Sequence, residues 1–175
     1  MRPRALALGN PEAPCGYNIG MNPYASFLGD RDARAVVSKT AARLSSHVER
    51  LGADGLKRSR APGKWSAGAI LCHLADCEIA FGFRLRQALA EENHVIQPFD
   101  QDAWAKPYER LDPHAALDMF TTARRWNLAF LATVTPDEFA KRLSHPERGE
   151  MTLATIVETM AGHDLNHLGQ LERIS

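Results

Sequence analysis

The stretch at residues 152–174, TLATIVETMAGHDLNHLGQLERI, decides the fold. Its apolar residues and histidines recur every three or four positions, which is typical of one face of a helix. This face carries Ile156, Met160, His163, His167, Leu171 and Ile174. The spacing predicts a long helix that buries this face against other helices, so both imidazoles are expected to point into the core.

Three further segments carry the same helical period, at residues 31–51, 66–92 and 112–135. Their expected N-caps are Asp30, Ser66 and Asp112, whose side chains can accept the free amide hydrogens of a first helical turn. Gly52 is the expected end of the first segment, and Pro113 opens the third. Four helices of about 20 residues around one core predict an all-α protein, a four-helix bundle.

Two connections between these helices carry signals of their own. A short helix is expected near residues 100–106, within the long connection at 93–111. The pattern TPDE at residues 135–138 is a capping box, which predicts a second short helix at the start of the connection 136–151. No alternation typical of β-strands is evident, so no sheet is predicted.

Charge and cysteine content narrow the class of protein. The 175 residues include 21 Lys and Arg against 21 Asp and Glu, so no net field favours nucleic acid or an anionic membrane surface as a partner. No apolar run is long enough to span a membrane. Three cysteines, an odd number, argue against a disulfide framework and favour the reducing cytoplasm.

The first 20 residues are expected to form a disordered leader, because prolines and glycines interrupt them repeatedly. The bundle domain is accordingly predicted to cover residues 21–175. Met21 is a candidate for the true start of the protein, which mass spectrometry of the native protein would decide.

His73 repeats the pattern of the last helix, since it lies three residues after Ile70 and four before Cys77 on an apolar face. Three histidines on core faces need partners, because a buried polar group without one costs about 1–3 kcal/mol. One divalent ion would satisfy three ring nitrogens together. We therefore predict a metal site formed by His73, His163 and His167. Three protein ligands would leave a coordination position for water or substrate, as in catalytic sites.

Other interpretations of the histidines stay open. They can be core residues that only form hydrogen bonds, and the protein can be a structural bundle. The motif HDLNH at residues 163–167 superficially resembles the zinc-protease pattern HExxH. Asp replaces the catalytic Glu there, and only eight residues follow, without a further histidine, so the sequence argues against such a protease. The remaining histidines are predicted to be solvated: His47, His94, His114 and His145.

The motifs KWS at residues 64–66, ILCHLADCE at 70–78 and HxxxH at 163–167 together resemble the DinB/YfiT-like superfamily. The resemblance extends over residues 22–175. It implies an up-up-down-down four-helix bundle, often dimeric, with a metal ion at one end. It also implies that the three histidines already chosen are the metal ligands. Family members of known activity include transferases and isomerases that depend on low-molecular-weight thiols.

Several side chains near the predicted metal are expected to support it or the core. Asp76 lies three residues after the first histidine, close enough to hold an imidazole or a metal-bound water. Asp164 is expected either to support the ligands or to lie on a solvated helix face. Glu78 is expected to form a salt bridge with an arginine such as Arg125. Cys77 is expected to be a small core residue rather than a thiolate ligand.

The sequence thus favours a metal-dependent enzyme of the thiol-transferase or hydrolase type, although no catalytic residue is assigned. Its substrate would be a small molecule, with a low-molecular-weight thiol as one candidate, and the resemblance favours a homodimer. Zinc and nickel are the expected metals, although imidazole also suits copper and iron. The alternative is a metal-binding or stress-associated bundle without catalytic activity.

Overall fold

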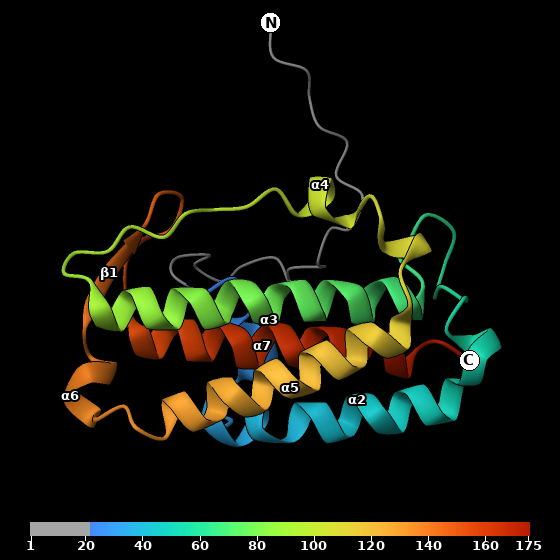
Figure 1. Cartoon of the computed structure of the whole chain (residues 1–175), viewed down its shortest axis with the longest axis horizontal. Coiled ribbons are helices and arrows are strands. Elements are labelled where there is room, and N and C mark those ends of the chain that lie inside the picture. Colours follow the sequence, from blue (N-terminus) through green and yellow to red (C-terminus); the bar gives the residue numbers. More distant parts are fainter. Residues whose placement is uncertain (1–21) are drawn as a thin grey trace, which may run out of the picture.

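The computed structural model describes residues 22–175, and four long helices dominate it (Figure 1). These are α2 (Ala33–Gly55), α3 (Ala67–Ala90), α5 (Pro113–Leu131) and α7 (Leu153–Glu172). The predicted all-α four-helix bundle is therefore confirmed. The predicted leader at residues 1–20 and the suggested start at Met21 lie outside the described residues, so they stay predictions.

Shorter elements connect and cover the bundle: α1 (Ala25–Leu28), α4 (Gln101–Ala105), the 3-10 helix η1 (Tyr108–Arg110), α6 (Pro136–Phe139), β1 (Arg142–His145) and β2 (Gly149–Thr152). The helices α4 and α6 confirm the two predicted short helices. The strands β1 and β2 pair as an antiparallel hairpin, so the prediction of no sheet was wrong. Strands of four residues are too short for their alternation to stand out in a sequence.

The direction of the helices differs from the order that the resemblance implied. α2 and α7 run parallel, because Thr40 meets Asp164 and, further along both helices, Arg50 meets Leu171. α3 and α5 both run the opposite way (Figure 1), so the order is up, down, down, up rather than up-up-down-down. The reason is the connection at residues 91–112, which runs back along the length of α3 before α5 begins.

The helices begin at capping side chains. Ser66, Asp112 and Thr152 accept first-turn amides of α3, α5 and α7. α2 begins later than expected, because Asp32 rather than Asp30 accepts the amides of Arg34 and Ala35. Gly52, with φ of 61° and ψ of −177°, is not helical and interrupts α2 with a kink, as predicted, so only a short last turn follows it.

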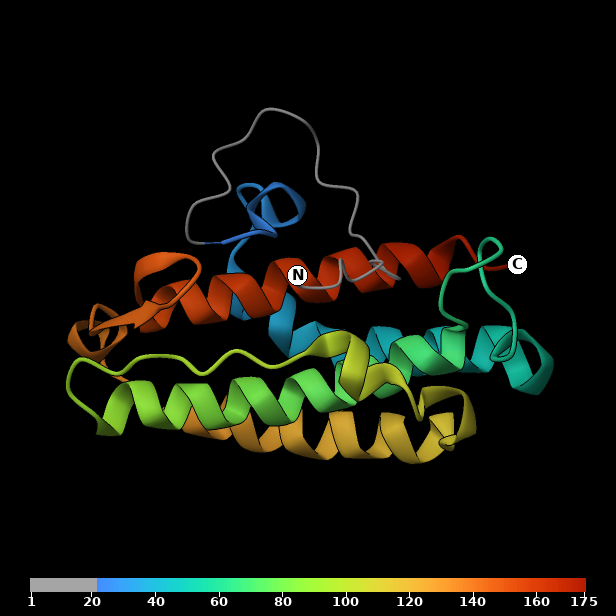
Figure 2. The same ribbon diagram turned by 90° about the horizontal axis from the view of Figure 1, so that it is seen from above.

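The short helix α1 lies on the outer side of α7, and α5 lies outside α3 (Figure 2). The contact between α1 and α7 is very close. A Cβ atom at Gly162 would lie 2.4 Å from the carbonyl oxygen of Tyr24, so only glycine fits this position of α7. The contact brings Tyr24 to the middle of α7, where the histidines lie.

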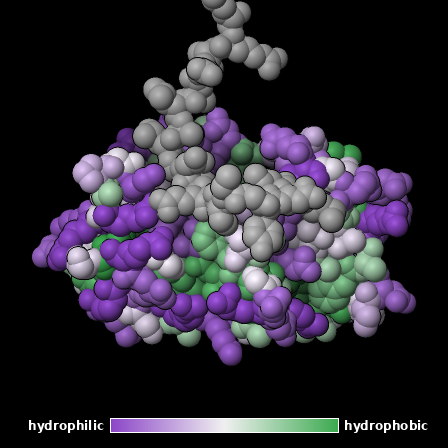
Figure 3. Space-filling view, turned by 180° about the vertical axis from the view of Figure 1, so that it is seen from behind, coloured by the Kyte–Doolittle hydropathy of each residue, from purple (hydrophilic) through white to green (hydrophobic). Residues whose placement is uncertain are grey.

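The face opposite to that of Figure 1 is hydrophilic around most of its edge, with hydrophobic residues towards its middle (Figure 3). The core itself consists of apolar side chains from all four long helices, with Leu44, Leu85, Phe120 and Met160 among those fully buried. No helix in residues 22–175 combines the length and the apolar character needed to cross a membrane.

Candidate metal centre

The three predicted histidines meet between α3 and α7. His73 comes from α3, and His163 and His167 lie one turn apart on α7; their exposed fractions are 1%, 3% and 5%. Nε2 of His73 lies 2.9 Å from Nε2 of His163. One ligand nitrogen from each ring lies within 4.8 Å of the others. The structure thus brings together the full set of residues that the helical period selected.

Burial keeps these imidazoles neutral. Desolvation lowers the pKa of His73 and of His163 well below the ordinary value, and the neighbouring imidazoles lower both further. Desolvation also lowers the pKa of His167, to about 4. Near pH 7 the rings are therefore uncharged, which is the form in which histidine binds a metal.

A hydrogen bond that His167 donates to Gln170 sets the tautomer of His167. Nδ1 of His167 lies 2.9 Å from Oε1 of Gln170, an oxygen that can only accept, so Nδ1 carries the proton. Nε2 therefore keeps its lone pair for a ligand role, as in many metal-binding histidines. The sequence analysis missed Gln170, although its place three residues after His167 on the same helix was an available signal.

The donor set fits a divalent ion. A tetrahedral ion with bonds of about 2.0–2.1 Å holds nitrogen ligands about 3.4 Å apart. The nitrogens of His73 and His163 lie 2.9 Å apart and all three ligand nitrogens lie within 4.8 Å of one another, so small shifts suffice to reach this spacing. Within the part of the chain that the structure describes, this cluster has three members and no fourth. Three imidazoles on one ion leave a position for water or substrate.

Aromatic side chains enclose the histidines. The ring of Trp65 lies 4.8 Å from that of His73, and the edge of Tyr24 lies 5.2 Å from the ring of His163. Nδ1 of His163 is buried without a hydrogen-bond partner among residues 22–175, so on this side of the ring packing alone holds the imidazole. Trp65, from the motif KWS, is therefore a wall of the site.

The thiol of Cys77 lies beside one of the histidines. Its Sγ lies 3.5 Å from Nε2 of His73. Burial raises the pKa of this thiol far above its ordinary range, so it is protonated at neutral pH. This agrees with a small core residue rather than a thiolate ligand.

The two carboxylates expected near the metal have other partners. Oδ2 of Asp76 accepts a hydrogen bond of 2.8 Å from the hydroxyl of Tyr108. Oδ2 of Asp164 accepts from Thr40 at 2.7 Å and from Arg124 at 2.6 Å, so it does not lie on a solvated face. Neither carboxylate bonds to an imidazole in residues 22–175, and a role of Asp76 towards a metal-bound water stays a prediction.

A buried ionic network lies beside the histidines. Arg124, only 2% exposed, donates to Glu78 at 2.7 Å and to Asp164 at 2.6 Å. Burial opposes its charge, yet Asp164 and Glu78 together raise the pKa of Arg124 above its ordinary value. The predicted partner of Glu78, Arg125, was wrong, because the arginine that contacts Glu78 is the preceding residue, Arg124. Arg125 is exposed, because one residue turns a helix by about 100° and directs the next side chain outward.

Two of the histidines predicted to be solvated are buried. His94 and His145 lie under the surface, because residues 94–97 hydrogen-bond to the edge of β1. Because the hairpin was not predicted, the burial of these two histidines could not be predicted either. His114 is exposed and His47 is partly exposed, in line with the prediction.

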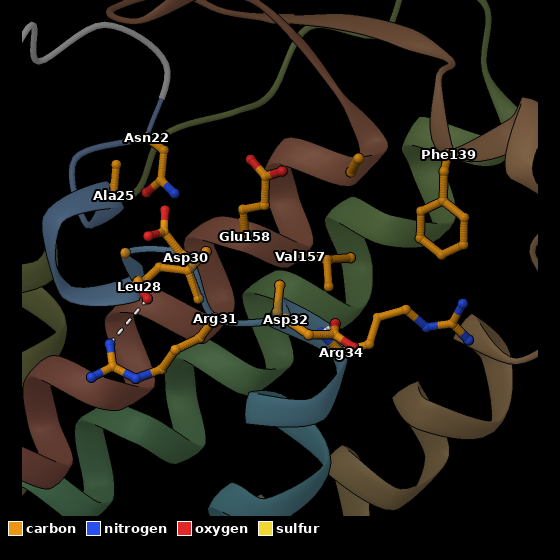
Figure 4. Close-up of a pocket in the computed structure, with 13 residues that line it drawn as sticks. Asn22, Ala25, Leu28, Asp30, Arg31, Asp32, Arg34, Phe139, Val157 and Glu158 are labelled. Atoms are coloured by element: carbon orange, nitrogen blue, oxygen red, sulfur yellow. Dashed lines mark hydrogen bonds between the residues drawn. The ribbon is translucent and has the colours of Figure 1, made fainter.

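A separate surface pocket of about 600 Å³ lies between α1, the start of α2, α6 and α7 (Figure 4). Its lining carries charges of both signs, and its arginines contact the protein itself. Arg31 donates to the carbonyl of Leu28 at 3.0 Å, and Arg34 lies 5.4 Å from the ring of Phe139. No histidine or cysteine lines it, so this pocket is not a candidate metal centre.

The fold and the site together define the class of this protein. It is a four-helix bundle in which three histidines converge between two helices, an arrangement suited to metal binding. The family model described as the DinB superfamily matches residues 37–171. The chain therefore belongs to the DinB superfamily, as the motifs of α3 and α7 indicated.

Named relatives agree with this assignment. YfiT of Bacillus subtilis, described as a candidate metal-dependent hydrolase, is 28% identical over 144 residues, covering 80% of each chain. A protein of Oceanobacillus iheyensis with the same description is 28% identical over 129 residues, covering 73% of this chain and 75% of the relative.

Solved structures show the same fold. The structure of YfiT superposes with a TM-score of 0.76 at 25% identity, covering 82% of this chain and 83% of YfiT. Its four-helix bundle is described as having an unusual topology. A mycothiol-dependent maleylpyruvate isomerase superposes with a TM-score of 0.66 at 13% identity, covering 79% of this chain and 59% of that one. The second likeness concerns the fold alone.

Proposed function

We propose that this chain is a metal-dependent hydrolase of a small molecule, in which His73, His163 and His167 hold one divalent ion. The observation that carries the proposal is the convergence of three buried, neutral imidazoles without a fourth ligand in the described cluster. Closed four-ligand sites are structural, whereas three-ligand sites are catalytic. The description of the relatives as candidate metal-dependent hydrolases supports the same class.

The ion would supply Lewis acidity and, in zinc enzymes, lowers the pKa of a bound water to about 7. Zinc and nickel are the ions that we propose. The chain itself orients the ligands, since Gln170 holds the proton of His167 on Nδ1. Trp65 and Tyr24 pack on two of the imidazoles and keep bulk water away from them.

A thiol-dependent transfer is the second candidate. In residues 22–175 no serine, threonine or carboxylate hydrogen-bonds to the three imidazoles, so the nucleophile would come from outside the chain. Water is one such nucleophile, and a low-molecular-weight thiol is another. A thiol bound to a metal loses its proton and becomes reactive.

Metal content and turnover test these proposals together. Wild type, His73→Ala and the control His114→Ala would be purified, analysed for metal, and assayed on esters and amides with and without added thiols. We expect about one metal equivalent in wild type and control, none in His73→Ala, and turnover that follows the metal. Equally little metal in all three would contradict the metal centre. Metal without turnover would favour the non-catalytic module.

We also propose a cytoplasmic homodimer. Cys72 and Cys77 are free thiols, as expected of a reducing compartment. Four large apolar side chains on α3 and α5, which we call the apolar strip, are exposed: Ile79, Phe83, Met119 and Trp126, at 48%, 59%, 41% and 68%.

The occupant of this strip that we favour is a second copy of the chain. A two-fold interface needs a surface that is complementary to itself. The exposed residues of α5 provide this about Thr122, because two antiparallel copies crossing there bring Asp118 of each near Arg125 of the other. The same crossing brings Met119 of each copy near Trp126 of the other.

A further inference from the structure

Two arginines near the histidines have no acidic partner in the part of the chain that the structure describes. Arg84 lies on α3 and Arg148 lies in the turn between β1 and β2, and both are half-buried. Neither guanidinium has a carboxylate within salt-bridge distance among residues 22–175. Arg84 donates one hydrogen bond of 3.2 Å to the carbonyl of Gln97 and lies 5.5 Å from the ring of Phe99. Most of the donors of both side chains therefore have no partner between residues 22 and 175.

The covering segment at residues 94–97 brings the two arginines to the same side of the site. The amide of Ser144 in β1 donates to this segment at 2.9 Å, and the carbonyl of Ser144 accepts from it at 2.8 Å. Gln97, at the end of the same segment, accepts from Arg84. Helix α3, which carries Arg84, and the hairpin, whose turn carries Arg148, therefore both contact this segment.

Both arginines also lie towards the three histidines. Arg84 follows Cys77 by seven residues, which on a helix is nearly the same face, about 10 Å further along the axis. The guanidinium of Arg148 lies near enough to the hydroxyl of Tyr24 to act on it electrostatically. Since Tyr24 touches the ring of His163, Arg148 lies close to the wall of the metal centre.

The charge of Arg148 disfavours the charged form of Arg84. Burial lowers the pKa of Arg84, and the charge of Arg148 lowers it further. Burial and then both arginines also lower the pKa of the neighbouring His145. The other buried arginine, Arg124, shows the contrast, because two carboxylates neutralise it. A pair of half-buried cations without a counter-charge creates a positive potential that attracts an anion.

We propose that Arg84 and Arg148 form a clamp for an anionic group on the substrate, either a carboxylate or a phosphate. The planar forks of guanidinium groups match both oxyanions and bind them with paired hydrogen bonds. Phe99 and Trp104, whose rings lie 4.6 Å apart beside Arg84, add an apolar wall for the rest of the molecule. The proposal rests on the enzymatic function proposed above and specifies the chemical class of its substrate.

Anion binding by the metal-free protein tests the clamp without any turnover. The full chain, treated with a chelator, would be titrated with sodium acetate and, separately, with sodium phosphate, while the Nε–H signals of its arginines are followed by NMR. Sodium chloride at equal ionic strength is the reference. We expect the signals of Arg84 and Arg148 to shift with saturation for at least one oxyanion. The oxyanion that saturates them identifies the class of the substrate group.

Variants assign the binding to the clamp. Arg148→Gln in the hairpin turn and Arg84→Gln are expected to weaken binding at least about tenfold, because each removes one charged fork. The matched control Arg142→Gln changes an exposed arginine of the same hairpin and should leave binding unchanged.

Signals that fail to saturate with either oxyanion, or that chloride reproduces, would overturn the clamp. Equal weakening by Arg148→Gln and Arg142→Gln would overturn it too. Because the titration uses the metal-free protein, it tests the clamp independently of the proposed metal-dependent function. Anion binding in a protein that never takes up metal would refute the metal-dependent function and leave the clamp standing, and metal-dependent turnover without anion binding would do the reverse.

Discussion

The bond between His167 and Gln170 is a single contact that prepares a ligand. It fixes the proton on Nδ1 and leaves Nε2 free. We expect Gln170→Ala to weaken zinc binding by about 10- to 100-fold, because loss of such supporting bonds has this effect in other metal sites. Competition with a chromophoric chelator measures the affinity. Gln87→Ala, at the far end of α3, is the control, and equal affinities in the two variants would show that Gln170 does not prepare the ligand.

The neutral histidines make the metal-free protein sensitive to acid. The pKa of each is lower in the folded state than the unfolded value near 6.5, so the folded chain binds fewer protons. Their contribution to stability is complete above pH 6.5 and is lost as the pH falls. For His167, with a pKa of about 4, the loss between these values is on the order of 3 kcal/mol.

Urea unfolding of the chelated protein between pH 7 and pH 5 would measure this decline. His167→Gln should give a shallower decline, since one of the three groups is gone. A stability of the wild type that stays constant over this range would contradict the burial of neutral imidazoles.

The burial of the three histidines could be predicted, because the helical period alone places a side chain on a buried face. Gln170 and the pair Arg84 and Arg148 could not be predicted in the same way. Their roles depend on which side chain or loop lies opposite, and a single sequence does not specify such long-range neighbours. The choice of Arg125 over Arg124 shows how sensitive a predicted partner is to one position.

Among the elements, α5 is tied to the others by Arg124, which contacts α3 through Glu78 and α7 through Asp164. We expect Arg124→Met to lower the free energy of unfolding by about 3–5 kcal/mol, because two buried carboxylates would lose their counter-charge. Urea denaturation measures the change. The neighbouring Arg125→Met, on the exposed face, should change it by less than about 0.5 kcal/mol. Similar values for the two variants would refute the importance of the network.

The packing of α1 on α7 depends on one glycine. A Cβ at Gly162 would clash with the carbonyl of Tyr24, a backbone atom that cannot turn away. We expect Gly162→Ala to displace α1 and to lower the melting temperature. Gly169→Ala meets nothing within 4 Å and should raise stability by up to about 1 kcal/mol through helix propensity. Calorimetry on both variants tests this, and a stabilised Gly162→Ala would contradict the close packing.

The long helices and their caps could be predicted because period and capping chemistry are local. α1 and the hairpin could not. α1 is a single turn held by its contact with α7, and each strand of the hairpin has only four residues. Such elements form through tertiary contacts rather than through their own sequence preference.

For the whole molecule, the apolar strip on α3 and α5 predicts the state of assembly. We expect the protein to be a dimer by light scattering after size-exclusion chromatography. Trp126→Glu should make it a monomer, because a charge at the proposed two-fold contact remains without a partner. Trp104→Glu, on α4 and also exposed, is the control and should stay dimeric. A monomeric wild type, or a dimeric Trp126→Glu, would refute the interface.

The helix order was the part of the architecture that could not be predicted. A connection of residues 91–112 is long enough to join either parallel or antiparallel helices, so its length does not decide the direction of α5. The structure shows that the chain uses this length to return along α3.

This order also brings together ligands that are far apart in the chain. His73 and His163 are separated by 90 residues. An ion held by both would act as a removable cross-link around a large loop, and closing a loop of this length with a disulfide removes about 4–5 kcal/mol of chain entropy from the unfolded state. Metal uptake would therefore report that the last helix has docked, and a truncated or half-folded chain would not retain the ion.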